Sequence, residues 1–277
     1  MSVVLRGKEL ESYNKARYSG QWLASAEHRL NSDYYKRDHN LDTLKILLDS
    51  PGQKVLECGI GTGEFFAMEL ARGGKSVYGI DFSDSLLSDC RARFSKEGFT
   101  AHLGMADAQK LPFAEGVFDA SYAIGVMPYM EDLDQAVGQM LRVTRKGGIV
   151  VFDMMNLWHP SQFINYWYRV FEASRFGFKT IDAMKRFKKS IGLKTNFKEM
   201  PEKVNYNLIS PLKMLKAVKR TRSKFRVMGY NVLLPLDMPF VGRAGNLCRR
   251  FPYFEKGLKD NRILKYLGAK LVFVIEK

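Results

Sequence analysis

The sequence predicts a doubly wound α/β fold, a mostly parallel sheet with helices on both faces, and three observations support this. Short apolar segments alternate with helix-like segments through the first half of the chain. Gly59, Gly61 and Gly63 mark the turn after the first apolar segment, and Asp81 ends the second. Strands separated by helices of roughly 10–15 residues are typical of βαβ units, whose strands run parallel.

The expected elements follow one another along the chain. Apolar and β-branched segments predict strands at 53–60, 76–83, 99–108, 116–126, 147–156, 225–236 and 269–277. Helical spacing predicts helices at 63–74, 83–98, 132–148 and 210–220. Ser83 is placed to cap the second of these helices, and Ser210 followed by Pro211 is typical of a helix start.

Length and composition favour one domain spanning 1–277. The 277 residues are 46% hydrophobic and 26% charged, which suits one large core. Because no apolar run of about 18 residues occurs and the first residues lack the apolar stretch of a signal peptide, we expect a cytoplasmic protein. Cys58, Cys90 and Cys248 lack metal-binding spacing, and no His, Asp and Glu cluster has it, so we expect no disulfide framework and no metal.

Charge divides the chain into two unlike halves. Residues 1–156 hold 18 basic and 21 acidic side chains, whereas 157–277 hold 26 and 8, so the second half supplies the whole net charge of +15. Between 185 and 226 there are fourteen basic residues and two acidic ones. Such a density repels itself unless an anion lies nearby, although a solvated face, or one that rests on anionic lipid, gives the same pattern.

The glycine-rich turn predicts a site for a nucleotide-like ligand, because glycines there let a ligand approach backbone amides and a helix N-terminus. Asp81 is placed to accept hydrogen bonds from a ribose diol. The turn reads G-x-G-x-G, not the G-x-G-x-x-G of dinucleotide folds, and follows Glu57. A carboxylate there repels a pyrophosphate and suits an amino group and a sulfonium cation. A tight turn with a helix-capping aspartate and no ligand is the alternative.

Four segments in order, LECGIGTGEF, YGIDFS, GMADAQKLPFAEGVFD and RVTRKGG, resemble the successive motifs of class I S-adenosylmethionine-dependent methyltransferases. The resemblance covers roughly residues 50–156. It points to the small-molecule branch that includes ubiquinone and menaquinone methyltransferases. It implies a seven-stranded sheet whose last strand is antiparallel, and S-adenosylmethionine as cofactor.

The resemblance also implies which residues hold this cofactor. It places the methionine part at the ends of the first and fourth strands, the ribose at the end of the second, and the adenine beside the second and third. The candidates are Glu57, Gly59, Gly61, Ala123 and Ile124 for the methionine part, Asp81 for the ribose, and Phe82, Asp107 and Ala108 for the adenine.

Two residues are candidates for catalysis. Alignment and exclusion of water supply most of the acceleration of methyl transfer, so acid–base groups are secondary. If the acceptor is a hydroxyl, a base helps, and His159, just past the fifth strand, lies at the appropriate end of the sheet. A helix cap or a surface position is the alternative for His159. Relatives often carry histidines after the fourth strand, where this chain has MPYM, so Tyr129 takes one of those places.

The second half predicts a helical cap inserted after the fifth strand, because 157–224 is longer than an ordinary connection. Phe163, Trp167 and Phe171 recur there at helical spacing, which indicates core packing, with a pocket lining or a membrane-facing surface as alternatives. The expected parts are an N-terminal lid at 1–40, a cofactor-binding core at 41–156, the basic and aromatic cap at 157–224, and the last two strands at 225–277. For residues 1–40, a helix packed on the sheet is the alternative to the lid.

These observations favour methyl transfer to a small or medium acceptor, an anionic, glycan- or lipid-linked metabolite drawn to the basic cap, with peripheral contact to an anionic membrane surface. An RNA methyltransferase that holds phosphates with the cap is the alternative. The sequence lacks the N/D-P-P-Y/F tract of nucleobase amino-group methylation, a cysteine in Pro-Cys context, and an appended RNA-binding module. A cofactor-binding scaffold without catalysis is a third hypothesis, which the intact motifs disfavour.

Overall fold

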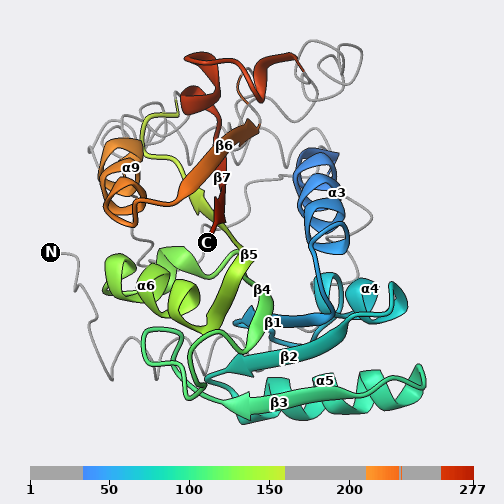
Figure 1. Ribbon diagram of the computed structural model, residues 1–277. Coiled ribbons are helices and arrows are strands. Elements are labelled where there is room, and N and C mark those ends of the chain that lie inside the picture. The colour runs from blue at the N-terminus through green and yellow to red at the C-terminus, as the bar shows by residue number, and fades with distance from the viewer. Residues whose placement is uncertain (1–33, 160–209, 231, 233–256) are drawn as a thin grey trace, which may run out of the picture.

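One seven-stranded sheet organises the computed structural model, which describes residues 34–159, 210–230, 232 and 257–277 (Figure 1). The strands lie in the order β3-β2-β1-β4-β5-β7-β6. Their bounds are β1 Lys54–Cys58, β2 Ser76–Asp81, β3 Ala101–Met105, β4 Phe118–Ala123, β5 Thr144–Met155, β6 Lys224–Tyr230 and β7 Lys270–Glu276. β1 to β5 pair in parallel, whereas β7 runs antiparallel between β5 and β6. The predicted sheet, with its antiparallel last strand, is confirmed.

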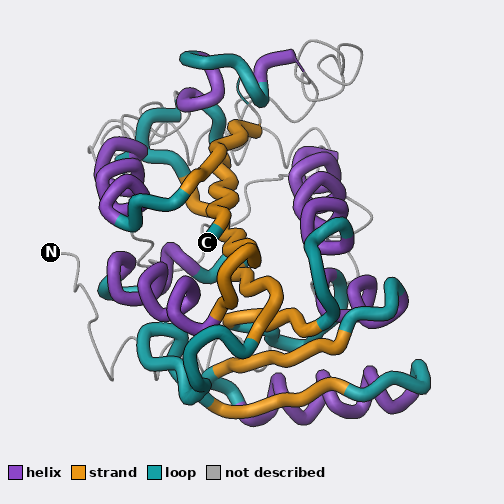
Figure 2. Tube along the Cα trace, viewed as in Figure 1, coloured by secondary structure: helices purple, strands orange, loops and turns teal. Residues whose placement is uncertain are grey.

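Helices cover both faces of this sheet (Figure 2). On one face lie α3 (Tyr34–Leu48), α4 (Phe66–Arg72) and α5 (Asp84–Lys96), packed with Val55, Val77 and other strand residues into one apolar cluster. On the other lie α6 (Leu133–Val143) and α9 (Pro211–Arg220), packed into a second. Because both faces are covered, the inner strands are continuously apolar instead of alternating, as in Val150, Val151 and Phe152.

The helix starts follow the signals in the sequence. The Ser83 hydroxyl accepts from the Leu86 amide at 3.4 Å at the start of α5, and the Asp132 carboxylate accepts from the Gln135 amide at 2.9 Å at the start of α6. Pro211 begins α9 after Ser210, whose side chain makes no capping hydrogen bond. The Ser83 and Asp132 caps each satisfy an amide that the first helical turn leaves without a partner.

Most predicted boundaries differ from the structure by a few residues, and the one between a helix and β5 differs more clearly. The helix expected to run to residue 148 ends at Val143, and β5 already begins at Thr144. The reason lies in the pairing of β5 with β4, because Thr144 pairs with Phe118 and its hydroxyl lies 2.8 Å from that of Ser121. Tertiary pairing here overrides the helical propensity of the preceding residues.

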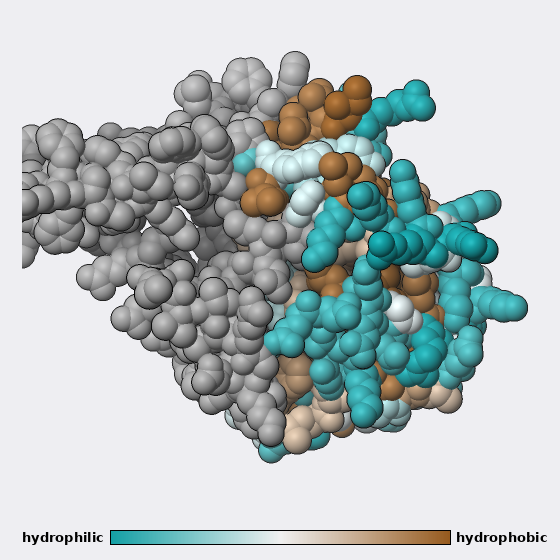
Figure 3. Space-filling model, turned by 90° about the vertical axis from the view of Figure 1, so that its left-hand side faces the viewer, coloured by the Kyte–Doolittle hydropathy of each residue, from teal (hydrophilic) through white to brown (hydrophobic). Residues whose placement is uncertain are grey.

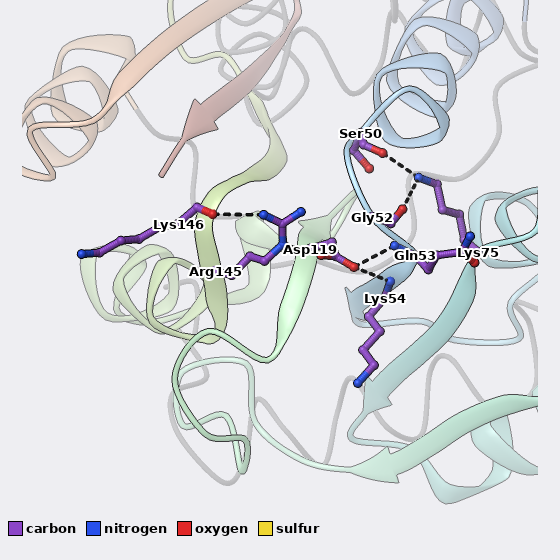
Figure 4. A network of polar contacts seen from close by, with 8 residues as sticks. All are labelled: Ser50, Gly52, Gln53, Lys54, Lys75, Asp119, Arg145 and Lys146. Carbon is purple, nitrogen blue, oxygen red and sulfur yellow. Dashed lines mark hydrogen bonds and ion pairs between the residues drawn. The ribbon is translucent and has the colours of Figure 1, made fainter.

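A polar network closes the amino-terminal edge of the sheet (Figure 4). Asp119, at the start of β4, accepts from the amides of Gln53 and Lys54 at 2.7 and 2.8 Å. The same carboxylate forms a short ion pair with the guanidinium of Arg145 on β5. The carboxylate thus joins three neighbouring strands, and all of its partners come from the chain itself.

Several expectations lie outside the described residues. These are residues 1–33 of the lid expected at 1–40, the aromatic stripe of Phe163, Trp167 and Phe171, most of the predicted cap, and Cys248. The remaining residues of that lid, 34–40, form the start of α3. Cys58 and Cys90 are free and buried. Where the structure describes the chain, every helix is too short or too polar to cross a membrane.

Candidate functional site

The turn after β1 forms the centre of the candidate site. The amides of Gly59 and Ile60 both donate to the Ile80 carbonyl of β2, at 2.8 and 3.0 Å, which anchors the turn to the neighbouring strand. Gly59, Gly61 and Gly63 have φ angles of 78°, 54° and 67°, in the left-handed region that favours glycine.

The three glycines serve different purposes. A Cβ at Gly59 would lie 2.5 Å from a Val126 methyl carbon, and one at Gly63 would lie 2.6 Å from the Cys90 sulfur, so both are needed for packing. A Cβ at Gly61 would meet nothing within 4 Å. Gly61 therefore faces open space at the carboxyl-terminal edge of the sheet, where doubly wound folds bind their ligands.

Asp81, the last residue of β2, is bound to this turn. One carboxylate oxygen accepts from the Gly61 amide at 2.9 Å and the other accepts from the Ser83 amide at 3.0 Å. Burial raises the Asp81 pKa, and these backbone hydrogen bonds oppose the rise. Because each carboxylate oxygen can accept two hydrogen bonds, Asp81 can hold the turn and still accept from two hydroxyls.

Glu57, near the end of β1, is buried and accepts from the Tyr122 hydroxyl of β4 at 2.7 Å. Burial raises the Glu57 pKa to about 8; the hydrogen bond from Tyr122 opposes this rise and the charge of Asp81 adds to it. Glu57 is therefore mostly protonated at neutral pH in the free protein. A cation placed beside it would favour the ionised form, so this acid suits a positively charged ligand group.

The ends of β2 and β3 present an apolar surface next to Asp81. Phe82 is 45% exposed and Met105, the register partner of Asp81, is 65% exposed. Asp107 accepts from the Gln109 amide at 2.7 Å, and Ala108 is buried. Exposed apolar side chains beside a carboxylate match the flat face and the amino edge of an adenine.

The end of β4 supplies the other side of the site. Ala123 is buried, Ile124 is partly buried, and the chain then turns through Gly125 into the 3-10 helix η1 (Met127–Tyr129). Tyr129 is partly buried at the end of η1. These positions border the carboxyl-terminal edge on the side opposite β2 and β3, because β1 lies between them in the sheet.

His159 lies just beyond β5 and is 2% exposed. Its backbone amide donates to the Asn156 carbonyl at 3.3 Å, in a turn that the Asn156 side chain ties to the carbonyls of Tyr266 and Gly268, each at 2.7 Å. This buried position differs from the surface position that was the alternative for His159. Its role as a base stays a prediction.

The sequence pattern did not identify three residues that the structure places at or beneath this edge. Tyr122 and Met105 lie within apolar strand patterns, where nothing distinguishes a hydroxyl or thioether that faces a site from one in the core. Asp153 is a lone acid inside the apolar segment IVVFDMM, and a carboxylate there requires a partner, which is a usable signal.

The geometry fits a cofactor that carries an adenosine and an amino acid cation. Gly61 leaves room for it, Asp81 can accept from a diol, Phe82 and Met105 offer an apolar surface, and the raised pKa of Glu57 marks a position that favours a cation. Among the described residues, no group of three or more His, Cys, Asp and Glu side chains is arranged to hold a metal ion.

Comparisons with known proteins agree with this geometry. Residues 56–152 match a family model described as "Methyltransferase domain". Methyltransferase GfsG of Streptomyces halstedii is 37% identical over 128 residues, which cover 46% of this chain and 43% of that protein. Ubiquinone/menaquinone biosynthesis C-methyltransferase UbiE of Laribacter hongkongensis is 38% identical over 114 residues, which cover 40% of this chain and 46% of that protein. The chain thus spans about half the length of the curated relatives it matches.

A solved structure extends the likeness of the fold. A protein of Thermotoga maritima, described as an S-adenosylmethionine-dependent methyltransferase and possible histamine N-methyltransferase, has a TM-score of 0.57 at 16% identity, covering 94% of this chain and 98% of that one. The fold is therefore shared along nearly the whole of that chain. Residues 56–152 thus match a methyltransferase domain, and the chain resembles the small-molecule branch of class I S-adenosylmethionine-dependent methyltransferases.

Proposed function

We propose that the protein transfers a methyl group from S-adenosylmethionine to a small or medium acceptor, an anionic, glycan- or lipid-linked metabolite. The observation that carries this proposal is the convergence of Glu57, Gly61 and Asp81 at one edge of the sheet, with open space in front of Gly61. The similar proteins described above support it, since all three are described as methyltransferases.

Each group at this edge has a definite task in the proposed reaction. Asp81 accepts from the ribose hydroxyls, while Phe82 and Asp107 hold the adenine by its face and its amino group. Glu57 balances the charge of the methionine part, beside Ala123 and Ile124. The cofactor itself supplies a sulfonium leaving group, so the protein needs mainly to orient the acceptor in line with the methyl group and to exclude water.

The acceptor would approach from the side of η1 and of the turn after β5. Tyr129 and His159 lie on these segments, and either could hold or remove a proton if the acceptor is a hydroxyl. Such a base affects the rate only for acceptors that must lose a proton during transfer. Both assignments depend on the acceptor atom.

The charge of the chain supports an anionic acceptor. In α9, the side chains of Lys213, Lys216, Lys219 and Arg220 are all exposed. Hydrophilic side chains gather on the side of the molecule where α6 and α9 lie (Figure 3). The Arg220 guanidinium also forms an ion pair with the Asp134 carboxylate of α6 at 3.1 Å, so part of this positive charge is neutralised within the protein. We propose a cytoplasmic location, with peripheral contact to anionic lipid as a further option for the same charge.

Two measurements test the proposal. Isothermal titration should show binding of S-adenosylmethionine and S-adenosylhomocysteine and none of NAD; heat from NAD alone would overturn the cofactor. Incubation of cell extract with methyl-labelled cofactor should then label a low-mass or lipid-linked product, which mass spectrometry identifies. Label in an RNase-sensitive fraction would instead establish the RNA alternative.

A further inference from the structure

A cluster of polar side chains around a buried carboxylate lies beneath the carboxyl-terminal edge of the sheet. Asp153 of β5 is fully buried, and one of its oxygens lies 2.5 Å from the Lys270 ammonium of β7 and 3.3 Å from Nε2 of His39 in α3. His39 is fully buried as well. Its Nδ1 lies 2.8 Å from the Asn40 side-chain oxygen, and its ring meets that of Tyr230 edge to face at 5.4 Å.

The second oxygen of Asp153 reaches the loop that borders the candidate site. It accepts from the backbone amide of Gly125 at 2.6 Å. Gly125 is exposed, has a φ of 75°, and a Cβ there would meet nothing within 4 Å. This glycine directly follows Ala123 and Ile124 and begins the turn that leads to Tyr129. Its amide therefore connects Asp153 to the loop that borders the candidate site.

The energetics of the cluster favour a role in positioning. Burial raises the Asp153 pKa, but the charge of Lys270 and the contact with His39 outweigh burial and hold this pKa well below its usual range. The carboxylate is therefore ionised at neutral pH. Removing a charge from water costs free energy, and the Lys270 side chain stays 23% exposed, so this ion pair adds little net stability compared with apolar packing. What it adds is a fixed geometry among the elements that it joins.

We propose that Asp153 is a positioning residue, which holds the Gly125 amide and thereby the loop from Gly125 to Tyr129 in the arrangement that receives the cofactor and the acceptor. His39 and Lys270 hold the carboxylate in turn, so α3 and β7 fix the position of this loop. The inference rests on the proposed function, because the loop matters for methyl transfer only if the cofactor binds at this edge.

The test compares one substitution at two places in the same sheet. Asp153→Asn removes the charge that holds the Gly125 amide, while Asp119→Asn makes the same change in the network at the opposite edge. We expect Asp153→Asn to weaken S-adenosylhomocysteine binding about tenfold, since hydrogen bonds to ionised groups are the strong ones. Deuterium exchange of the backbone amides at 125–130 should also become about tenfold faster, because the loop opens more often.

Asp119→Asn should lower the melting temperature but leave both readouts within about twofold of the wild type. An Asp153→Asn protein that loses melting temperature while its affinity and its exchange at 125–130 stay unchanged would show a purely structural role and overturn the inference. If Asp153→Asn does not fold, His39→Gln keeps the carboxylate and Lys270. It should still accelerate exchange at 125–130, and unchanged exchange would overturn the inference equally.

The outcomes separate this inference from the proposed function. Failure of the wild-type protein to bind S-adenosylmethionine or S-adenosylhomocysteine would remove the proposed function, whereas the exchange experiment needs no ligand and still tests the hold on the loop. Tight binding by the wild type together with unaltered binding and exchange in Asp153→Asn would leave the proposed function in place and reject only the positioning role.

Discussion

The two edges of the sheet use the same residue types for different purposes. At the amino-terminal edge, Asp119 takes two backbone amides and one guanidinium, all from the chain. Burial raises the pKa of Asp119. The hydrogen bonds from Arg145 and the two amides lower this pKa by more than burial raises it, so the pKa lies below its usual value. At the carboxyl-terminal edge, Glu57 and Asp81 have raised pKa values.

This difference shows how structural acids can be told from binding acids. Asp119 has a cationic partner and two amide donors within the chain. Within the described part of the chain, the hydrogen-bond donors to Glu57 and Asp81 are the Tyr122 hydroxyl and the amides of Gly61 and Ser83, none of which is a cation. A ligand with an ammonium, a sulfonium and a diol would supply the charge and the further donors. Acids with raised pKa values at an edge with open space are therefore candidates for binding.

The pH dependence of folding gives the largest expected difference between the edges. The pKa of Glu57 is about 8 in the folded protein and about 4.5 in the unfolded chain, so its contribution is fully present below pH 4.5 and is lost as pH rises through 8. Between pH 5 and 8 this loss should reach about 3–4 kcal/mol. Urea unfolding at several pH values measures it, and Glu57→Gln should remove it.

Asp119 provides the control of opposite sign. Because its folded pKa is lowered, its stabilising contribution is present above the unfolded pKa and is lost as pH falls. Asp119→Asn should therefore flatten the acid side of the stability profile and leave the range between pH 5 and 8 unchanged. A Glu57→Gln protein with the same slope as the wild type between pH 5 and 8 would contradict the raised pKa.

Asp81→Ala should have the next largest effect, on ligand affinity. We expect S-adenosylhomocysteine to bind about 1.5–3 kcal/mol more weakly, because hydrogen bonds from the ribose to an ionised group are lost. The turn also loses its anchor to the Gly61 amide, so part of this loss comes through the turn. Isothermal titration measures the change, and an Asp81→Ala protein with normal affinity would show that the ribose lies elsewhere.

Asp119→Ala should affect stability and leave binding unchanged. Two backbone amides and Arg145 lose their partner, which should lower the free energy of unfolding by about 1–3 kcal/mol. The affinity for S-adenosylhomocysteine of the folded fraction should stay within about twofold. A clear loss of affinity would mean that the two edges are coupled through β1 and β4, and the contrast between them would not hold.

Most of the fold could be predicted from the sequence, since the inner strands are apolar on both faces and the helices carry start signals such as Ser83 and Pro211. The start of β5 could not, because residues 144–148 have no strand signal until Thr144 and Arg145 meet their partners on β4. Pairing between strands is a long-range property that local pattern does not contain.

The candidate site was only partly predictable. Glycine spacing identified the turn at Gly61, and the order of the strands brought Asp81 beside it. The partners of the acids were not predictable, since the contacts of Glu57 with Tyr122 and of Asp153 with His39 join residues far apart in the sequence. An ionised Glu57 was expected from the sequence, whereas burial raises the pKa of Glu57 to about 8 and keeps it mostly protonated at neutral pH until a cation is present.

The smallest effect is expected from the basic surface of α9. Changing Lys213, Lys216 and Lys219 together to Gln should alter the free energy of unfolding by less than about 0.5 kcal/mol, because exposed charges are screened. The affinity of the triple variant for S-adenosylhomocysteine should not change.

Direct RNA binding by the protein should be weak, independent of sequence, and lost near physiological salt. Binding along α9 would instead fall log-linearly with salt, and each lost lysine would reduce the slope by about one. A triple variant with a much shallower slope, together with label on RNA in extract, would reverse the preference for a small acceptor. An unchanged yield of labelled low-mass product from the triple variant would support that preference. One anionic group is held by only two or three side chains, so most of the basic residues can change without loss of turnover.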